Sequence, residues 1–382
     1  MSARGAYLLV TGDFARTGGM DRANFALASH LAEEGNEVHL VAHRADPALE
    51  VRQNVHLHRV PKPAGSYLLG EPLLARAGRS WAHRLSPRAC RVVVNGGNCL
   101  WGDANWVHYV HAAYEPTSMT GTLYRLKTRV ARDRALRQER ETLRRASVVV
   151  CNSERTRKDV IERLGVSASR THVVYYGTDA EAFGPVTIEA RLAARRALGL
   201  SSDRPLVLFI GALGDRRKGF DTLFAAWRSL SKERRWDADL IVAGVGSELS
   251  AWRARAVEEG LAERIRFLGF RSDVDRLLAA SDALVHPARY EAYGLGVREA
   301  LSRGVPALVS ESAGVAEHYP SALGELLIRD PESPEELADR LRHWRRSLES
   351  TRDRVARLAQ ALREHTWERM SSEIVRVIEA ND

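Results

Sequence analysis

The sequence has little cysteine. Its 382 residues include three, Cys90, Cys99 and Cys151, an odd number whose spacing matches no metal-ligand pattern. These features exclude a disulfide-stapled secreted domain and a cysteine-based zinc site. We therefore expect reduced thiols that pack as small apolar side chains.

The sequence also lacks long apolar runs. None approaches the roughly 18 residues that a membrane-spanning helix needs. The apolar stretch 6–11 (AYLLVT) is too short for the core of a signal peptide, and no cleavage site follows it. Hydrophobic residues make up 45% of the chain and charged residues 28%, which is typical of a globular protein. We expect a cytoplasmic protein, and its length allows two domains of ordinary size.

Acidic residues are scarce in the first half of the chain. Residues 1–180 hold 26 Lys and Arg against 17 Asp and Glu, whereas the remainder holds 31 against 32. The most basic segment, 122–145, carries a loose apolar stripe. It is either an amphipathic helix that meets an anionic membrane surface or anionic acceptor, or a solvated helix with opposite-charge neighbours. Because aromatic residues are not interleaved with the basic ones, we expect no nucleic-acid partner.

Strands alternate with helices, which predicts an α/β protein with two parallel sheets. Each predicted strand ends in a glycine-bearing or polar loop at one edge of its sheet, where open α/β sheets bind ligands. Gly18 and Gly19 follow the first strand, but they do not form a G-x-G-x-x-G fingerprint. His108 and His111 end another strand, and their spacing lets only one of them face the ligand. The predicted strands are 7–11, 37–42, 55–60, 91–95, 106–110, 147–152 and 172–176, then 206–210, 240–243, 266–268, 281–287 and 305–309.

The most informative stretch is residues 289–304 (RYEAYGLGVREALSRG), which predicts a glycine-containing turn and then a helix. Unpaired N–H groups at the start of such a helix favour an anion such as phosphate. Glu291 and Glu299 could bind hydroxyl groups on either side of that anion, although alone they could also be the acid–base pair of a hydrolase. No Asp-x-Asp motif is present to hold Mg²⁺.

Glu291 and Glu299 resemble the E-x7-E motif of retaining glycosyltransferases of family 4, which have the GT-B fold. The resemblance covers nearly the whole chain. Its other motifs are weak singly but specific in this order and spacing. They are Gly18-Gly19, His111 in HAAYEP, Asn152-Ser153, Tyr176-Gly177-Thr178-Asp179 in place of the usual asparagine-glycine-valine-aspartate, Arg217-Lys218-Gly219, Gly244-Val245-Gly246, Phe267-Leu268-Gly269, Gly304-Val305-Pro306, Ala313-Gly314 and Glu317.

The resemblance implies two Rossmann-like domains that face each other across a cleft. Residues 1–184 would bind the acceptor, residues 185–364 the nucleotide sugar, and residues 365–382 would form a helix that returns to the first domain. The residues at the reacting groups would be Glu291 and His111 on the transferred sugar and Lys218 on the diphosphate. The donor-binding residues would be Gly18 and Gly19 in a closing loop, Arg217 and Lys218, Phe270, Arg271 and Tyr293, Gly294 and Leu295 through their N–H groups, and Glu299 on the ribose.

The implied reaction is retaining, metal-independent transfer of a hexose from a nucleotide-diphosphate sugar to an acceptor hydroxyl, with no cofactor. We expect a lipid-linked or lipopolysaccharide-like saccharide acceptor in cell-envelope synthesis, and an enzyme peripheral to the inner face of the plasma membrane through residues 122–145. The alternatives are a soluble small-molecule acceptor, an epimerase or phosphorylase of the same fold, and a non-enzymatic binder. The sequence carries no sign of the extra phosphate or cofactor site that a phosphorylase needs.

One departure from the family pattern concerns the diphosphate cations. The family commonly has an arginine where this chain has Ala212, between Gly211 and Leu213. Arg216 or Arg217 could supply the missing charge, or Lys218 could act alone.

Overall fold

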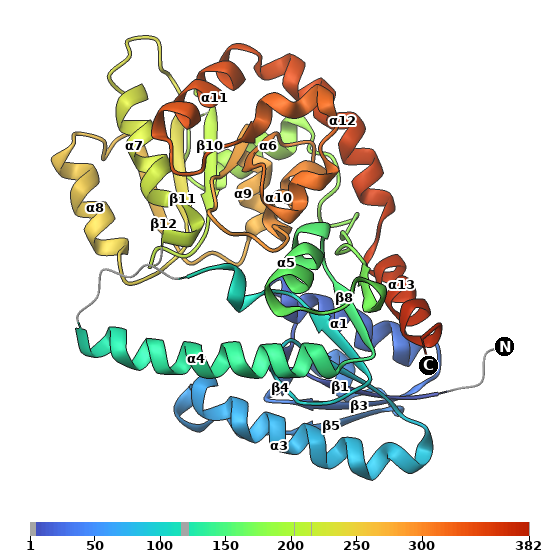
Figure 1. Cartoon of the computed structure of the whole chain (residues 1–382). Coiled ribbons are helices and arrows are strands. Elements are labelled where there is room, and N and C mark those ends of the chain that lie inside the picture. The colour runs from blue at the N-terminus through green and yellow to red at the C-terminus, as the bar shows by residue number, and fades with distance from the viewer. Residues whose placement is uncertain (1–4, 116–121, 202, 215, 382) are drawn as a thin grey trace. The chain divides into compact units, whose positions relative to one another are not determined.

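A computed structural model of the chain describes residues 5–115, 122–201, 203–214 and 216–381 (Figure 1). These residues form two compact units. Unit 1 contains the chain up to Glu115, the part from helix α4 (Thr122–Arg145) to Gly177, and the residues from Thr366 on, and unit 2 contains Thr178–His365. The chain thus enters unit 2 a few residues before the expected end of the first domain, and its last helix belongs to unit 1.

The core of unit 1 is a parallel sheet in the order β5-β3-β1-β6-β7-β8-β9. Its central strands are continuous apolar runs that are fully buried, as expected where helices cover both faces of a parallel sheet. A short parallel pair, β2 (Asp13–Phe14) and β4 (Arg44–Ala45), follows β1 and β3. The strands of the main sheet are β1 (Ala6–Val10), β3 (Glu37–Ala42), β5 (Val55–Arg59), β6 (Arg91–Asn95), β7 (Ala104–Val107), β8 (Val148–Cys151) and β9 (Thr171–Val173).

The last helix of the chain, α13 (Trp367–Glu379), packs on α1 (Met20–Glu33), and Figure 1 shows the two side by side in red and blue. Ser372 Oγ lies 3.2 Å from His30 Nε2. Tyr7 OH donates to Glu379 Oε1 at 3.0 Å. The other helices of unit 1 are α2 (Pro47–Glu50), α3 (Tyr67–Leu85), α4 and α5 (Glu154–Leu164), with 3₁₀ turns η1 (Pro63–Gly65), η2 (Ser86–Arg88), η3 (His111–Ala113) and η4 (Ala168–Arg170).

Unit 2 contains a second parallel sheet, in the order β12-β11-β10-β13-β14-β15. One large apolar cluster fills the space between its strands and helices. The strands are β10 (Leu206–Ile210), β11 (Asp239–Ala243), β12 (Ile265–Gly269), β13 (Ala283–His286), β14 (Ala307–Ser310) and β15 (Leu327–Ile328). The helices are α6 (Ile188–Ala197), α7 (Phe220–Leu230), α8 (Leu249–Glu258), α9 (Val274–Ala280), α10 (Leu295–Ser302), α11 (Pro334–Arg346) and α12 (Leu348–Glu364), with 3₁₀ turns η5 (Arg216–Lys218), η6 (Gly314–His318) and η7 (Ser321–Leu326).

Arg298, a buried residue of α10, forms hydrogen bonds with residues at both ends of unit 2. Its guanidinium donates to Thr178 Oγ1 at 2.7 Å and to the carbonyl oxygens of Leu362 at 3.1 Å and His365 at 3.2 Å. The N–H group of Thr178 also donates to the His365 carbonyl at 2.9 Å. The points where the chain enters and leaves unit 2 therefore meet at the helix that follows the glycine turn.

Four helices, α2, α3, α6 and α8, were missing from the sequence-based assignment. The region 65–86, which had no assigned structure, contains α3, whose pattern is interrupted by Gly70, Pro72 and Gly78. Gly78 is needed for packing, because a Cβ atom there would lie 2.8 Å from Val10 Cγ1. Helix α6 lies between the strands predicted at 172–176 and 206–210, where the sequence analysis predicted no element.

The strand predicted at 106–110 was displaced toward the C-terminus, because β7 runs from Ala104 to Val107. Strand β7 ends at Val107, and His111 lies in the 3₁₀ turn η3. The prediction that the three cysteines are free and buried is confirmed. Among the described residues, none of the helices combines the length and apolar character that a membrane crossing requires.

Candidate active site

The segment predicted as strand, glycine turn and helix adopts that structure in unit 2. Strand β13 ends at His286, and α10 begins after Gly294, the N-cap residue. Gly294 has φ 109°, which glycine adopts without strain, and a Cβ atom there would lie 2.9 Å from Val315 Cγ1. The N–H group of Val297 donates to the Gly294 carbonyl at 3.0 Å, so the donors left at the positive end of the helix dipole are those of Leu295 and Gly296. The turn therefore offers donors for an anion at the carboxyl-terminal edge of the sheet.

Three side chains form a charged cluster at this edge. Lys218 Nζ donates to Glu291 Oε2 at 2.5 Å, and His286 Nε2 lies 2.8 Å from the same oxygen. Burial by itself would raise the pKa of Glu291, but the charge of Lys218 and the hydrogen bond from His286 outweigh it and hold the pKa well below its ordinary value. Burial and then the charge of Lys218 lower the pKa of His286. Glu291 is thus ionised at neutral pH, next to a neutral imidazole and a lysine.

Lys218 is positioned by a close approach between two loops. The carbonyl oxygen of Arg217 accepts from the N–H group of Arg289 at 2.8 Å, which joins η5 to the loop after β13. Gly219 has φ 70°, and a Cβ atom there would lie 1.9 Å from the carbonyl oxygen of Pro287. A side chain at position 219 would force the loops apart and move Lys218 away from Glu291.

The two arginines next to Lys218 have different surroundings. Arg216 is exposed and binds Asp221, with Nη2 2.6 Å from Oδ2. The charge of Arg217, by contrast, contributes to the low pKa of Glu291. Ala212, which stands where the family commonly has arginine, is exposed.

The other predicted donor residues of unit 2 lie on neighbouring elements. Glu299 is buried in α10, with 8% of its surface exposed. The phenol of Tyr293 is also buried; it accepts from Arg298 Nη1 at 2.9 Å, and burial raises its pKa to about 12. A contact from Tyr293 to a ligand would therefore use its backbone. Phe270, after β12, is 75% exposed, whereas Arg271 is held by Asp273 through two hydrogen bonds.

The predicted residues of unit 1 lie in the loops that follow β1 and β7. Gly18 is exposed with φ 84°, and Gly19 is the N-cap residue of α1. His111 is half exposed, and its Nδ1 lies 3.0 Å from Oε1 of the buried Glu139. The Glu139 carboxylate also accepts from the N–H groups of His111 at 2.8 Å and Ala112 at 3.2 Å. This arrangement places the proton on Nδ1 and leaves Nε2 as an acceptor.

His108, the second histidine of this region, has a different environment. It is part of a buried network with the Tyr176 hydroxyl and Asn152, whose Nδ2 donates to the His108 carbonyl at 3.1 Å. Burial lowers the pKa of His108 to about 3, so its imidazole is neutral. His111 is thus more exposed than His108, because it lies in the turn η3 beyond the end of the strand.

Sequence reasoning missed two members of these clusters. His286 is the last residue of a buried strand, where a polar side chain is itself a signal of function. Glu139 is an acid within the basic segment 122–145, and nothing in the sequence indicates its contact with His111. A third cluster, Glu37, His39 and His56 of unit 1, is the group of described residues with metal-ligand spacing. The sequence pattern that could have indicated this cluster is Glu-x-His in one predicted strand followed by His-x-His in the next.

Two family profiles match the chain. The profile for Glycosyltransferase Family 4 matches residues 17–182, and the profile for Glycosyl transferases group 1 matches residues 190–361. The lipopolysaccharide glucosyltransferase WaaG of Escherichia coli K12 is 33% identical over 148 residues, 39% of this chain and 39% of that protein. The D-inositol 3-phosphate glycosyltransferase of Corynebacterium glutamicum strain R is 26% identical over 357 residues, 87% of this chain and 83% of that protein. The chain thus matches less than half of the length of the first relative.

Solved structures match over almost the whole chain. The crystal structure of WaaG superposes with a TM-score of 0.76 at 22% identity, covering 97% of this chain and 99% of that one. Sucrose-phosphate synthase from Thermosynechococcus elongatus superposes with a TM-score of 0.75 at 20% identity, and the match covers 99% of each chain. Anabaena HepE in complex with UDP and glucose superposes with a TM-score of 0.72 at 18% identity, and the match covers 99% of this chain and 100% of that one.

Two Rossmann-like parallel-sheet units, with a glycine turn and helix start at the sheet edge of the second, form the GT-B fold. The two profiles identify the chain as a glycosyltransferase. The chain belongs to glycosyltransferase family 4.

Proposed function

We propose that the protein is a retaining, metal-independent hexosyltransferase that uses a nucleotide-diphosphate sugar as donor. The observation that carries the proposal is the cluster of Lys218, Glu291 and His286 beside the first turn of α10. It combines a cation and free backbone donors, which suit a diphosphate, with an ionised carboxylate, which suits a sugar hydroxyl.

Charge development explains why these groups are needed. Breaking the bond between sugar and phosphate builds negative charge on the diphosphate. Lys218 and the N–H groups of α10 are fixed before the reaction, so they stabilise that charge without reorganising. Glu291, held by Lys218 and His286, orients the sugar and stabilises the cationic transition state, and we assign no side-chain nucleophile. The acceptor hydroxyl attacks from the leaving-group side, and the diphosphate helps to take its proton.

The surface of unit 1 favours an anionic or lipid-linked saccharide as acceptor. In the described part of α4, Arg134, Arg137 and Arg140 are exposed. Four large apolar side chains at the start of α3 are also exposed: Tyr67 (48%), Leu68 (60%), Leu69 (52%) and Leu73 (39%). Basic and apolar side chains together suit the interface of an anionic membrane. The name of WaaG, a lipopolysaccharide glucosyltransferase, supports the same class of acceptor. The runner-up is a soluble small-molecule acceptor, for which the D-inositol 3-phosphate glycosyltransferase is the precedent.

A thermal-shift panel of UDP-, GDP-, ADP- and dTDP-sugars tests the donor. A ligand that binds the folded protein raises its stability in proportion to the logarithm of its concentration over Kd. We expect one nucleotide series to raise Tm in wild type and to lose most of that effect in Lys218→Ala. The matched control Lys232→Ala removes an exposed lysine of unit 2 and should respond as wild type does. Absence of any shift across the panel would contradict the proposal.

An epimerase of the same fold is the alternative enzyme. Incubation with the selected nucleotide sugar in the absence of an acceptor separates the two activities. An epimerase converts the sugar under these conditions, whereas a transferase leaves it intact apart from slow hydrolysis and reacts when the acceptor is added.

A further inference from the structure

Four polar side chains occupy alternate positions on two neighbouring strands of unit 1. Glu37 and His39 belong to β3, and His56 and His58 belong to β5, the edge strand of the sheet. The strands are parallel, and His39 pairs directly with His56. Because side chains alternate between faces with a period of two, this register places all four on the same face.

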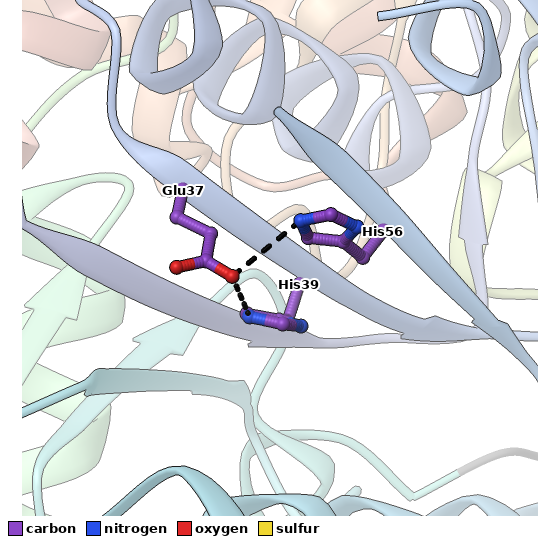
Figure 2. A group of neighbouring side chains, drawn as sticks. All are labelled: Glu37, His39 and His56. Carbon is purple, nitrogen blue, oxygen red and sulfur yellow. Dashed lines mark hydrogen bonds and ion pairs between the residues drawn. The ribbon is translucent and has the colours of Figure 1, made fainter. Parts of the chain in front are cut away.

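Three of these side chains converge on one point (Figure 2). Glu37 Oε1 lies 3.2 Å from His39 Nε2 and 3.5 Å from His56 Nε2, and the ligand atoms of the three residues all lie within 4.8 Å of one another. In a tetrahedral zinc site with bonds of about 2.0–2.1 Å, neighbouring ligand atoms are roughly 3.3 Å apart. Two of the three separations therefore already match the spacing of a coordinated ion.

His58 lies directly behind His39. Its Nε2 is 3.0 Å from His39 Nδ1, and its ring stacks on Trp81 with centroids 3.5 Å apart. At this distance His58 Nε2 can accept a hydrogen bond from His39 Nδ1, which leaves His39 Nε2 facing Glu37. Metal-ligating histidines are commonly oriented by such a hydrogen bond from the second ring nitrogen.

The three side chains of this cluster differ in how far they are exposed to solvent. The side chain of His39 is 6% exposed, whereas those of His56 and Glu37 are 42% and 41% exposed. An ion can reach the cluster from solvent, and water can complete its coordination. Glu37 begins β3, whereas the Gly18–Gly19 loop follows the carboxyl end of the neighbouring β1, so the cluster lies at the opposite edge of the sheet from the predicted donor loop.

We propose that Glu37, His39 and His56 bind a divalent transition-metal ion of the Zn²⁺ type, with His58 as a positioning residue for His39. The two imidazoles and one carboxylate match the ligand preference of Zn²⁺ and are a poor set for Mg²⁺. The ion joins β3 to the edge strand β5, so its role is to stabilise the sheet. It takes no part in sugar transfer.

Calorimetric titration of the chelator-treated full chain with ZnCl₂ tests this site. We expect one ion per chain, a rise in Tm on binding, and no competition from Mg²⁺. Glu37→Gln and His56→Ala should each weaken binding at least about tenfold, and His58→Ala about 10- to 100-fold. His343→Ala, which removes an exposed histidine of unit 2, should bind as wild type does.

Several outcomes would overturn the proposal: no saturable binding, tenfold tighter binding of Mg²⁺ than Zn²⁺, or unchanged affinity in both Glu37→Gln and His56→Ala. Because both residues are partly exposed, metal-free circular dichroism should show both variants folded. An anomalous-scattering map of crystals grown with Zn²⁺ provides a second measurement, and a peak anywhere other than at these three side chains also overturns the proposal.

Discussion

Lys218 Nζ lies 2.5 Å from Glu291 Oε2, and the two side chains are only 17% and 13% exposed. A buried carboxylate needs this partner, because removing one member of a buried ion pair leaves an uncompensated charge. A diphosphate would compete for the same lysine. We expect a sugar hydroxyl then to donate to Glu291, so that donor binding exchanges one partner of the carboxylate for another.

The first prediction concerns this pair. Lys218→Ala removes a fixed cation from the leaving group and should lower turnover on the order of 100- to 1,000-fold. Glu291→Ala should also abolish most transfer. Lys232→Ala and Glu258→Ala, which alter exposed residues of unit 2, serve as controls. Initial rates with the donor selected by thermal shift provide the measurement, and near wild-type rates in the Lys218 and Glu291 variants would refute the assignment.

The second prediction identifies the cation that replaces the arginine absent at Ala212. Arg217 influences the charge state of Glu291, whereas Arg216 is bound to Asp221. Arg217→Ala should therefore weaken binding of the nucleoside diphosphate by about tenfold, in line with a charged hydrogen bond of roughly 1.5 kcal/mol. Arg216→Ala is the matched control and should change the affinity by less than about threefold. Equal losses in both variants, measured by calorimetry, would show that the two arginines share the role.

The third prediction concerns His111. Glu139 holds Nδ1 of the imidazole and two backbone N–H groups. Glu139→Gln keeps the shape but places an amide near those donors, which turns the ring or changes its tautomer. We expect turnover to fall on the order of 10- to 100-fold with little change in donor affinity. Glu141→Gln alters an exposed acid of the same helix and should remain active. Wild-type turnover in a folded Glu139→Gln protein would exclude this positioning role.

The fourth prediction is a pH dependence at Asp21, next to the Gly18–Gly19 loop. Burial and then the charge of Asp13 raise the pKa of Asp21 from 3.8 to about 6. The folded protein therefore binds this proton more tightly than the unfolded chain, so the contribution of Asp21 is most favourable below pH 4 and is lost as pH rises through about 6. The Tm of Asp21→Asn relative to that of wild type should therefore increase as the pH is raised from 4 to 7. The exposed control Glu34→Gln should show no such trend, and a constant difference for Asp21→Asn would contradict the shift.

The fifth prediction tests membrane attachment. Wild type should sediment with vesicles that contain acidic lipid at low salt and be released at high salt, because each basic residue near the surface contributes about 1 kcal/mol. The double variant Arg134→Glu/Arg137→Glu should sediment at least about tenfold less. Arg234→Glu/Arg235→Glu makes the same charge change at exposed positions of unit 2. No sedimentation of wild type, or equal loss in both double variants, would favour the soluble acceptor.

Much of the fold could be predicted because strands and helices of α/β proteins have distinct periods. The strands predicted at 37–42, 91–95 and 206–210 have the same bounds as β3, β6 and β10. Ser153 and Gly165 are the residues that cap the two ends of α5. Helix α3 could not be found in this way. Gly78 allows close packing against Val10 of β1, and Gly70 allows close packing against His43, so the tertiary structure requires both of these breaks in the helical pattern.

The site could be predicted only as far as local motifs reach. Lys218 and Glu291 are 73 residues apart in the sequence. Each lies in a motif that follows a predicted strand, and this predicted that both lie at the same edge of the sheet. Contacts such as Glu139 with His111 depend on how a helix lies across a turn, and no local pattern encodes that geometry. The clustering of Glu37, His39 and His56 depends on strand register, which becomes visible only once β3 and β5 are paired.

The position of Arg298 has a consequence for protein engineering. Since one guanidinium joins the residues at both ends of unit 2, that unit is an insertion whose termini are already adjacent. Segments with adjacent termini are those that tolerate transplantation into loops of other proteins. We therefore expect that unit 2 can be inserted into a loop of another protein, joined through Thr178 and His365, provided that Arg298 is kept.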